Sequence, residues 1–91
     1  MSVHIKRLLV DALKSRETSI IELSRALCTV EGVEEVDITV TEVDVTTETI
    51  KVTIRGPSVN YGKLSKMMEK YGISVKGIDE VSVAKVKSSH E

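Results

Sequence analysis

Hydrophobic and polar residues alternate strictly along two neighbouring stretches of the chain, residues 36–40 and residues 50–54. A period of two places successive side chains on opposite faces of a β-strand. The turn between the stretches, residues 44–47, lacks the Asn-Gly pair that is typical of a two-residue hairpin. We therefore expect an antiparallel hairpin with a longer loop, one buried face and one wet face.

The two ends of the chain also have strand patterns. Residues 2–13 begin with alternation and then bring Leu8, Leu9 and Val10 together. Apolar residues on both faces are typical of a strand that is buried on both sides. A scattered apolar pattern over residues 73–86 predicts the last strand, with Gly77 as a candidate bulge.

Helical spacing appears twice. Ser19 opens a capping box S-x-x-E, and an apolar stripe over residues 20–30 follows it. A second stripe begins after a cap at Ser58 or Asn60 and ends at Gly72. Each helix therefore lies between two predicted strands.

The element order is β-α-β-β-α-β, which predicts an α+β fold of the ferredoxin-like type, a two-layer sandwich. Its antiparallel sheet has the order 4-1-3-2, and both helices cover one face. We expect a single ferredoxin-like domain over residues 1–86 and a flexible C-terminal tail over residues 87–91. Because the second face of the sheet is open, Leu8, Leu9 and Val10 cannot all point at the helices. An exposed apolar residue there favours a second copy of the chain as partner.

Composition narrows the classes of function. The net charge is −1 and aromatic residues make up 2% of the chain, so neither a basic surface nor a base-stacking platform for nucleic acid is indicated. The single cysteine, Cys28, cannot form a disulfide within the chain and favours a reducing compartment. No signal-peptide pattern and no apolar stretch near 20 residues is present. We expect a cytoplasmic protein that does not bind membranes.

Acidic residues are the main candidates for chemistry. In the expected topology, the end of the first strand, the hairpin turn and the start of the last strand meet at one edge of the sheet. Carboxylates gathered there repel one another unless a cation, a basic side chain or water separates them. Calcium or magnesium, which take oxygen ligands, are the candidate ions. The predicted metal ligands are Asp11, Glu42, Asp44, Glu48, Asp79 and Glu80. A solvated rim with Lys14 and Arg16 nearby is favoured over a metal site, since solvent screens the repulsion and no EF-hand spacing is present.

Other polar residues have weaker signals. His4 lies on the first strand and His90 in the tail, and solvated side chains are expected there rather than metal ligands. Cys28 has no partner for catalysis or metal binding and fits a helix-packing role. No nucleophile is paired with a base, so we predict neither catalytic nor cofactor-binding residues, and a binding role is favoured over an enzyme. Three lysines recur at helical spacing on the second helix and form either an anion-attracting stripe or a solvated face, namely Lys63, Lys66 and Lys70.

Five segments spread over residues 5–84 carry a resemblance: L-L-V-D-A-L-K, S-I-I-E-L-S-R-A-L, E-G-V-E-E-V-D-I-T-V-T-E-V-D, T-E-T-I-K-V-T-I-R-G and G-I-D-E-V. Together they resemble an archaeal family known as the domain of unknown function number two hundred and eleven. The resemblance implies a ferredoxin-like fold, an archaeal cytoplasmic protein and ring-like homo-oligomers, without an established activity. The chain departs from the family pattern at Ser15, where proline is usual, and at Lys76, where histidine is frequent. The family-typical acids are the six predicted ligands and Glu22.

Two hypotheses of function follow. The first is a homo-oligomeric scaffold or regulatory module that binds a divalent cation through the acids of the rim. The second is a small-metabolite sensor in which Lys51 or Arg55 meets an anionic ligand between subunits.

Overall fold

The computed structural model describes residues 2–86, so the predicted tail at residues 87–91 lies outside the described residues. Six elements follow one another along the chain. They are β1 (Ser2–Ser15), α1 (Ile20–Cys28), β2 (Glu35–Val43), β3 (Thr47–Arg55), α2 (Tyr61–Lys70) and β4 (Ser74–Val86). The predicted order β-α-β-β-α-β is confirmed.

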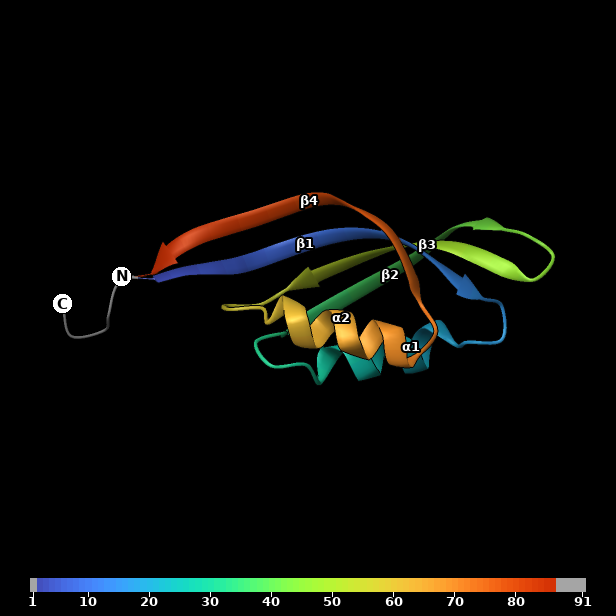
Figure 1. Cartoon of the computed structure of the whole chain (residues 1–91), viewed down its shortest axis with the longest axis horizontal. Coiled ribbons are helices and arrows are strands. Elements are labelled where there is room, and N and C mark those ends of the chain that lie inside the picture. The colour runs from blue at the N-terminus through green and yellow to red at the C-terminus, as the bar shows by residue number, and fades with distance from the viewer. Residues whose placement is uncertain (1, 87–91) are drawn as a thin grey trace.

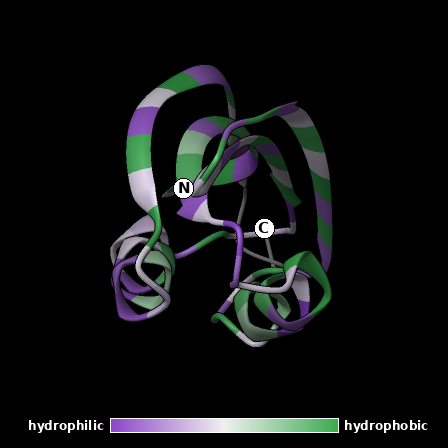
Figure 2. Ribbon diagram, turned by 90° about the vertical axis from the view of Figure 1, so that its right-hand side faces the viewer, coloured by the Kyte–Doolittle hydropathy of each residue, from purple (hydrophilic) through white to green (hydrophobic). Residues whose placement is uncertain are grey.

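One four-stranded antiparallel sheet holds the fold together. Its strand order is β2-β3-β1-β4, which is the predicted order read from the other edge. Both helices lie on the same side of this sheet (Figures 1 and 2). The register aligns a row of apolar residues across the four strands, Ile38, Val52, Val10 and Ile78. The ferredoxin-like α+β fold is therefore confirmed.

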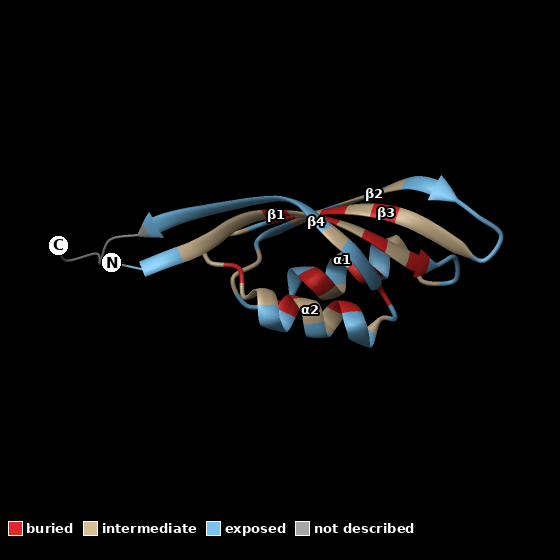
Figure 3. Cartoon of the chain, turned by 45° about the horizontal axis from the view of Figure 1, so that its top comes forward, coloured by how far each residue is buried: buried red, intermediate tan, exposed pale blue. Residues whose placement is uncertain are grey.

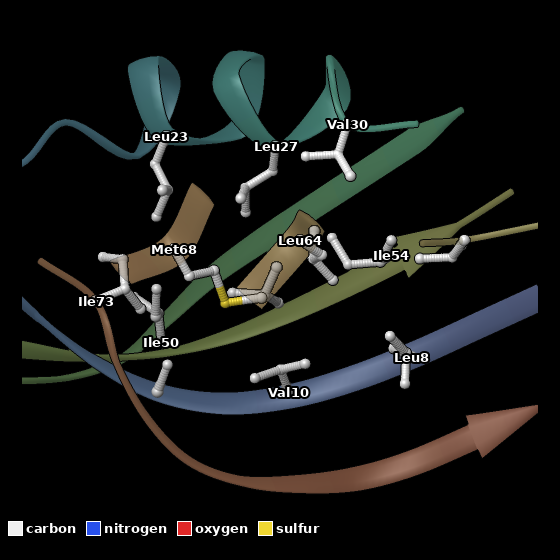
Figure 4. Close-up of a cluster of buried hydrophobic side chains, with 13 residues drawn as sticks. Leu8, Val10, Leu23, Leu27, Val30, Ile50, Ile54, Leu64, Met68 and Ile73 are labelled. Atoms are coloured by element: carbon white, nitrogen blue, oxygen red, sulfur yellow. The ribbon is translucent and has the colours of Figure 1, made fainter. Parts of the chain in front are cut away.

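The core is aliphatic and lies between the helices and the centre of the sheet (Figure 4). Leu23 and Leu27 of α1 are completely buried, as is Leu64 of α2. They pack toward Val10 and Ile50 and the neighbouring sheet residues. Each such side chain stabilises the fold by about 1.5–3 kcal/mol relative to leaving it exposed.

Strand β1 is buried mainly on one face. Leu8, Val10 and Ala12 face the helices and are at most 1% exposed, whereas Leu9 and Leu13 are half-buried. Leu9 pairs with Thr53 on the open face, the side of the sheet away from the helices. The expectation of burial on both faces is wrong, because α1 and α2 cover only one side of the strand. The expectation that one of the three apolar residues lies on the open face is confirmed by Leu9.

Side-chain caps set where the helices begin. The Ser19 hydroxyl accepts hydrogen bonds from the backbone N–H groups of Ile21 and Glu22, as the capping box predicts. Asn60 rather than Ser58 caps α2, with its Oδ1 accepting from the Lys63 N–H at 3.0 Å. Helix α1 ends at Cys28, two residues before the predicted end. None of the helices in residues 2–86 is both long and apolar enough to span a membrane.

Two loops cross tightly beneath one end of the sheet. Gly32 follows α1 and has a φ of +83°, a conformation that side chains other than glycine rarely adopt. A Cβ atom there would lie 1.7 Å from the carbonyl oxygen of Ser58, in the loop before α2. The crossing fixes the position of both helices relative to the sheet.

Strand β4 is exposed along nearly its whole length (Figure 3). It pairs with β1 and bows away from the helices (Figure 1). Its register shifts beside Gly77, where a bulge was predicted, and again where Asp79 is inserted between paired residues. Four of its apolar side chains are between 38% and 55% exposed, namely Val75, Ile78, Val81 and Val83.

Candidate functional site

The six predicted acids lie in three separate places. Glu42 and Asp44 are at the end of the β2–β3 hairpin, where they line a polar hollow of about 340 Å³. The Asp44 carboxylate accepts a hydrogen bond from the Val45 N–H at 2.7 Å. These two carboxylates are exposed and lie beyond the helices, at one end of the molecule.

Glu48 lies on the opposite face of the sheet from the other strand acids. It forms an ion pair with Lys14, which is the register partner of Glu48 and is only 3% exposed. The Lys14 ammonium also donates to the carbonyl oxygens of Ser15 and Thr18, at 3.1 and 2.7 Å. Sequence reasoning missed this buried cation. The signal was present, because the period of two in Leu8, Val10 and Ala12 continues to residue 14.

Asp11 and Asp79 meet around Lys51 on the open face. The Lys51 ammonium donates a hydrogen bond to Asp79 and lies 3.6 Å from Oδ1 of Asp11. The hydrogen bond to Asp79 raises the pKa of Lys51; burial acts in the opposite direction, and the Asp11 charge adds to the increase. Oδ1 of Asp11 is buried and is the one such side-chain atom in residues 2–86 without a hydrogen-bond partner. A buried carboxylate oxygen without a hydrogen-bond partner is stabilised by a nearby cation or hydrogen-bond donor.

Further ion pairs continue across the open face. Glu80 pairs with Arg7, and Arg55 contacts Asp37 at 2.8 Å and Glu35 at 3.6 Å. Side chains of both signs are well exposed here, so each pair adds at most about 1 kcal/mol to stability. Basic side chains thus separate several of the carboxylates that were expected to repel one another.

The single acidic rim expected from the topology does not form. Strand order predicts which strand ends are neighbours, but successive side chains of a strand point to opposite faces of the sheet. Glu48 therefore lies on the helix-facing side, whereas the other predicted ligands lie on the open face or at the end of the hairpin. Within residues 2–86, no group of three or more His, Cys, Asp or Glu side chains has a geometry suited to a metal ion. Of the six predicted ligands, only Asp11 and Asp79 share a basic partner, Lys51, within residues 2–86.

A second hollow lies between the helices and has the opposite charge. It has a volume of about 470 Å³ and we call it the lysine groove; its lining residues are Thr29, Val30, Glu31, Lys63, Lys66, Met67 and Lys70. The Lys63 ammonium contacts Glu31 at 2.6 Å and, through this hydrogen bond, lowers the pKa of the Glu31 carboxyl. Lys66 and Lys70 have no carboxylate within 4.0 Å in the part of the chain that the structure describes.

The remaining candidates are local. The His4 ring lies between two hydroxyls, with Nδ1 2.5 Å from Ser58 Oγ and Nε2 2.7 Å from Ser2 Oγ. Cys28 is exposed, and its thiol donates to the Glu34 carbonyl oxygen at 3.6 Å. His90 lies outside the described residues.

Element order, strand order and the one-sided helical layer define a ferredoxin-like α+β protein. Residues 6–88 match the model of the domain-of-unknown-function family 211, described as Uncharacterized ArCR, and the chain belongs to that family. It is 35% identical over 81 residues to the Uncharacterized protein MJ0319 of Methanocaldococcus jannaschii, covering 89% of this chain and 84% of that relative. The resemblance found in the sequence is thereby confirmed. Neither description names an activity.

Proposed function

We propose that this chain is a binding module rather than an enzyme and that its copies assemble into a ring-like homo-oligomer through β4. The observation that carries this proposal is the uncovered apolar surface of that strand. Ile78 and Val81 pair with Val10 and Leu8 and share their helix-facing side. Val10 and Leu8 are at most 1% exposed, whereas Ile78 and Val81 are 45% and 55% exposed. The row of apolar residues on the helix-facing side thus continues onto β4, but the helices do not cover that strand.

A second copy is the simplest cover for this surface. Strand β4 is an edge strand, so one side of its backbone is open to pairing with another strand. At the other edge of the sheet, β2 is open as well. A contact that joins different edges of successive copies is heterologous, and it closes into a ring when the rotation between copies allows.

The second candidate function is binding of a divalent cation by Asp11 and Asp79. Support comes from the buried, unpartnered Oδ1 of Asp11 and from the position of Asp79 beside the same Lys51 ammonium. A calcium or magnesium ion would take the place of that ammonium. Two carboxylates supply at most four oxygens, so calcium would keep water or gain ligands from another subunit.

Support for the metabolite-sensor hypothesis is weaker. Lys51 contacts Asp79, and Arg55 contacts Asp37 at 2.8 Å. An anionic ligand would have to displace these carboxylates before it met either basic group. The cation hypothesis is therefore better supported than the metabolite-sensor hypothesis.

Sedimentation velocity of variants tests the assembly. Placing a charge in the β4 surface, by Ile78→Lys or Val81→Lys, is expected to raise the dissociation constant between copies by about tenfold or more, because a buried apolar contact is lost. Ile21→Lys is the matched control, since Ile21 is 63% exposed on α1. A wild-type chain that stays monomeric at millimolar concentration would overturn the proposal.

Titration calorimetry with calcium and with magnesium tests the cation site. Asp79→Asn is expected to weaken binding, and Lys51→Met to strengthen it, because the ammonium competes with the ion. Glu80→Gln is the control, since Glu80 pairs with Arg7 and not with Lys51. Absence of binding heat in both the wild type and the Lys51→Met variant would remove this candidate.

A further inference from the structure

We propose that the tip of the β2–β3 hairpin of one copy docks into the lysine groove of a second copy. The hairpin tip is defined as residues 42–46, E-V-D-V-T. This inference rests on the proposed homo-oligomer and names a contact within it. It concerns different residues from the β4 surface.

The groove offers an apolar floor and a basic wall. Val30 is 6% exposed and Met67 is half-buried, so both have surface at the bottom of the hollow. Lys63, Lys66 and Lys70 follow one side of α2 at spacings of three and four residues, a row about 10 Å long. Because Lys66 and Lys70 lack a carboxylate partner within residues 2–86, their charges are available to an anionic group.

The hairpin tip has the complementary character. Val43 and Val45 are 60% and 83% exposed, which makes Val45 the most exposed large hydrophobic side chain in residues 2–86. Glu42 and Asp44 stand beside them, and residues 41–50 contain no lysine or arginine. A hydrogen bond of 2.8 Å from the Asp44 N–H to the Thr47 carbonyl oxygen closes the turn and holds its shape. The tip therefore presents two valines and two carboxylates on a pre-formed hairpin.

The tip lies far from the α1 end of the groove of its own chain. It lies at the start of β3, whereas the α1 end of the groove, Thr29–Glu31, lies beside the loop that follows β3. The nine residues of β3 separate these two ends by about 30 Å. Figure 1 shows the hairpin projecting past the helices at the far end. A tip that reaches the α1 end of the groove must therefore belong to another molecule, and a second copy supplies both charges and apolar side chains of the required kind.

Charge reversal tests the contact by sedimentation velocity. The groove variant is Lys66→Glu with Lys70→Glu, and the tip variant is Glu42→Lys with Asp44→Lys. Each alone is expected to raise the dissociation constant by about tenfold or more, since like charges then face each other. An equimolar mixture of the two is expected to restore assembly, because each acidic surface again meets a basic one. Arg16→Glu with Arg25→Glu is the control for net charge.

The outcomes separate this inference from the assembly through β4. Charge-reversed variants that assemble like the wild type, while Val81→Lys dissociates, would overturn the docking and leave the β4 proposal standing. Loss of assembly in both charge-reversed variants, without recovery of assembly in their mixture, would also overturn the docking. This outcome would indicate another occupant of the groove, such as an acidic peptide or a phosphate-bearing ligand.

Chemical cross-linking gives a second measurement that does not depend on the strength of assembly. Cys28 is exposed and adjoins Thr29 of the groove. With Val45→Cys, a short bismaleimide is expected to join the tip of one copy to Cys28 of the next and give a ladder of covalent oligomers. Adding Cys28→Ser should stop the ladder at dimers, and Ile21→Cys serves as the control position. A Val45→Cys chain that gives no ladder overturns the proposal.

Discussion

At the scale of single residues, the ammonium of Lys14 is a buried charge whose stability depends on its partners. Its side chain is 2% exposed, and its partners are the Glu48 carboxylate and two backbone carbonyls. Because all of them would lose their donor, Lys14→Met is expected to lower the free energy of unfolding by about 2–4 kcal/mol. Urea denaturation measures the change.

A double variant distinguishes the ion pair from simple packing. Lys14→Met with Glu48→Met replaces both charges by apolar groups of similar length, and it is expected to recover part of the lost stability. A Lys14→Met chain as stable as the wild type would contradict the role given to this ammonium.

Glu31 provides a test of electrostatics on the surface. The hydrogen bond from Lys63 lowers the pKa of its carboxyl below the usual 4.5. In an NMR titration, the carboxyl midpoint is expected below 4.5 and should return toward that value in Lys63→Gln. A lowered pKa in the folded state stabilises the fold above the unfolded value, and this contribution is lost as the pH falls through the folded pKa. An unchanged midpoint in the variant would contradict the assignment.

At the scale of elements, the crossing of two loops at Gly32 fixes how the helices meet the sheet. A Cβ atom at Gly32 would overlap the Ser58 carbonyl, and the φ of +83° is unfavourable for alanine. Gly32→Ala is therefore expected to lower the free energy of unfolding by about 2 kcal/mol or more. Gly77→Ala is the control, since nothing lies within 4 Å of a Cβ there. Thermal denaturation of the two variants makes the comparison, and equal stabilities would contradict it.

The elements could be predicted from the sequence because their patterns are local. Alternation in residues 36–40 and 50–54 and the cap at Ser19 each depend on a few neighbouring side chains. The strand order then followed from known topology rules. The candidate site could not be predicted in the same way. Asp79 and Glu80 are adjacent, yet both contact bases on the open face, Lys51 and Arg7. Strict alternation would put these two side chains on opposite faces of the sheet, but the register shift at Asp79 brings both to the same face.

At the scale of the whole molecule, the chain is long for its mass. Its extents are 54 × 22 × 17 Å, and its radius of gyration is 14.1 Å, against about 12 Å for a compact domain of this length. The hairpin tip extends past the helices at one end, and the paired strands β1 and β4 extend at the other (Figure 1). Both projections leave apolar side chains in water. An elongated chain with apolar ends is suited to the proposed contacts with further copies.

This shape predicts that stability differs between strands and depends on concentration. Strand β3 pairs with a neighbour on each side and buries Ile50, Val52 and Ile54. Strand β4 pairs only with β1 among the described strands and is exposed on both faces, so it should open locally at low free-energy cost. Amide hydrogen exchange read by mass spectrometry is expected to be about tenfold or more faster in β4 than in β3 at micromolar concentration.

Assembly should then protect β4 and leave the central strand β3 unchanged. If copies join through this strand, its amides gain protection as the protein concentration rises, by mass action, while those of β3 exchange at the same rate throughout. The Val81→Lys variant should lose the concentration dependence and keep the fast exchange. Protection of β4 that equals that of β3 in the dilute wild type would mean that the strand is stable without a partner, and it would remove the physical reason for assigning the subunit contact to β4.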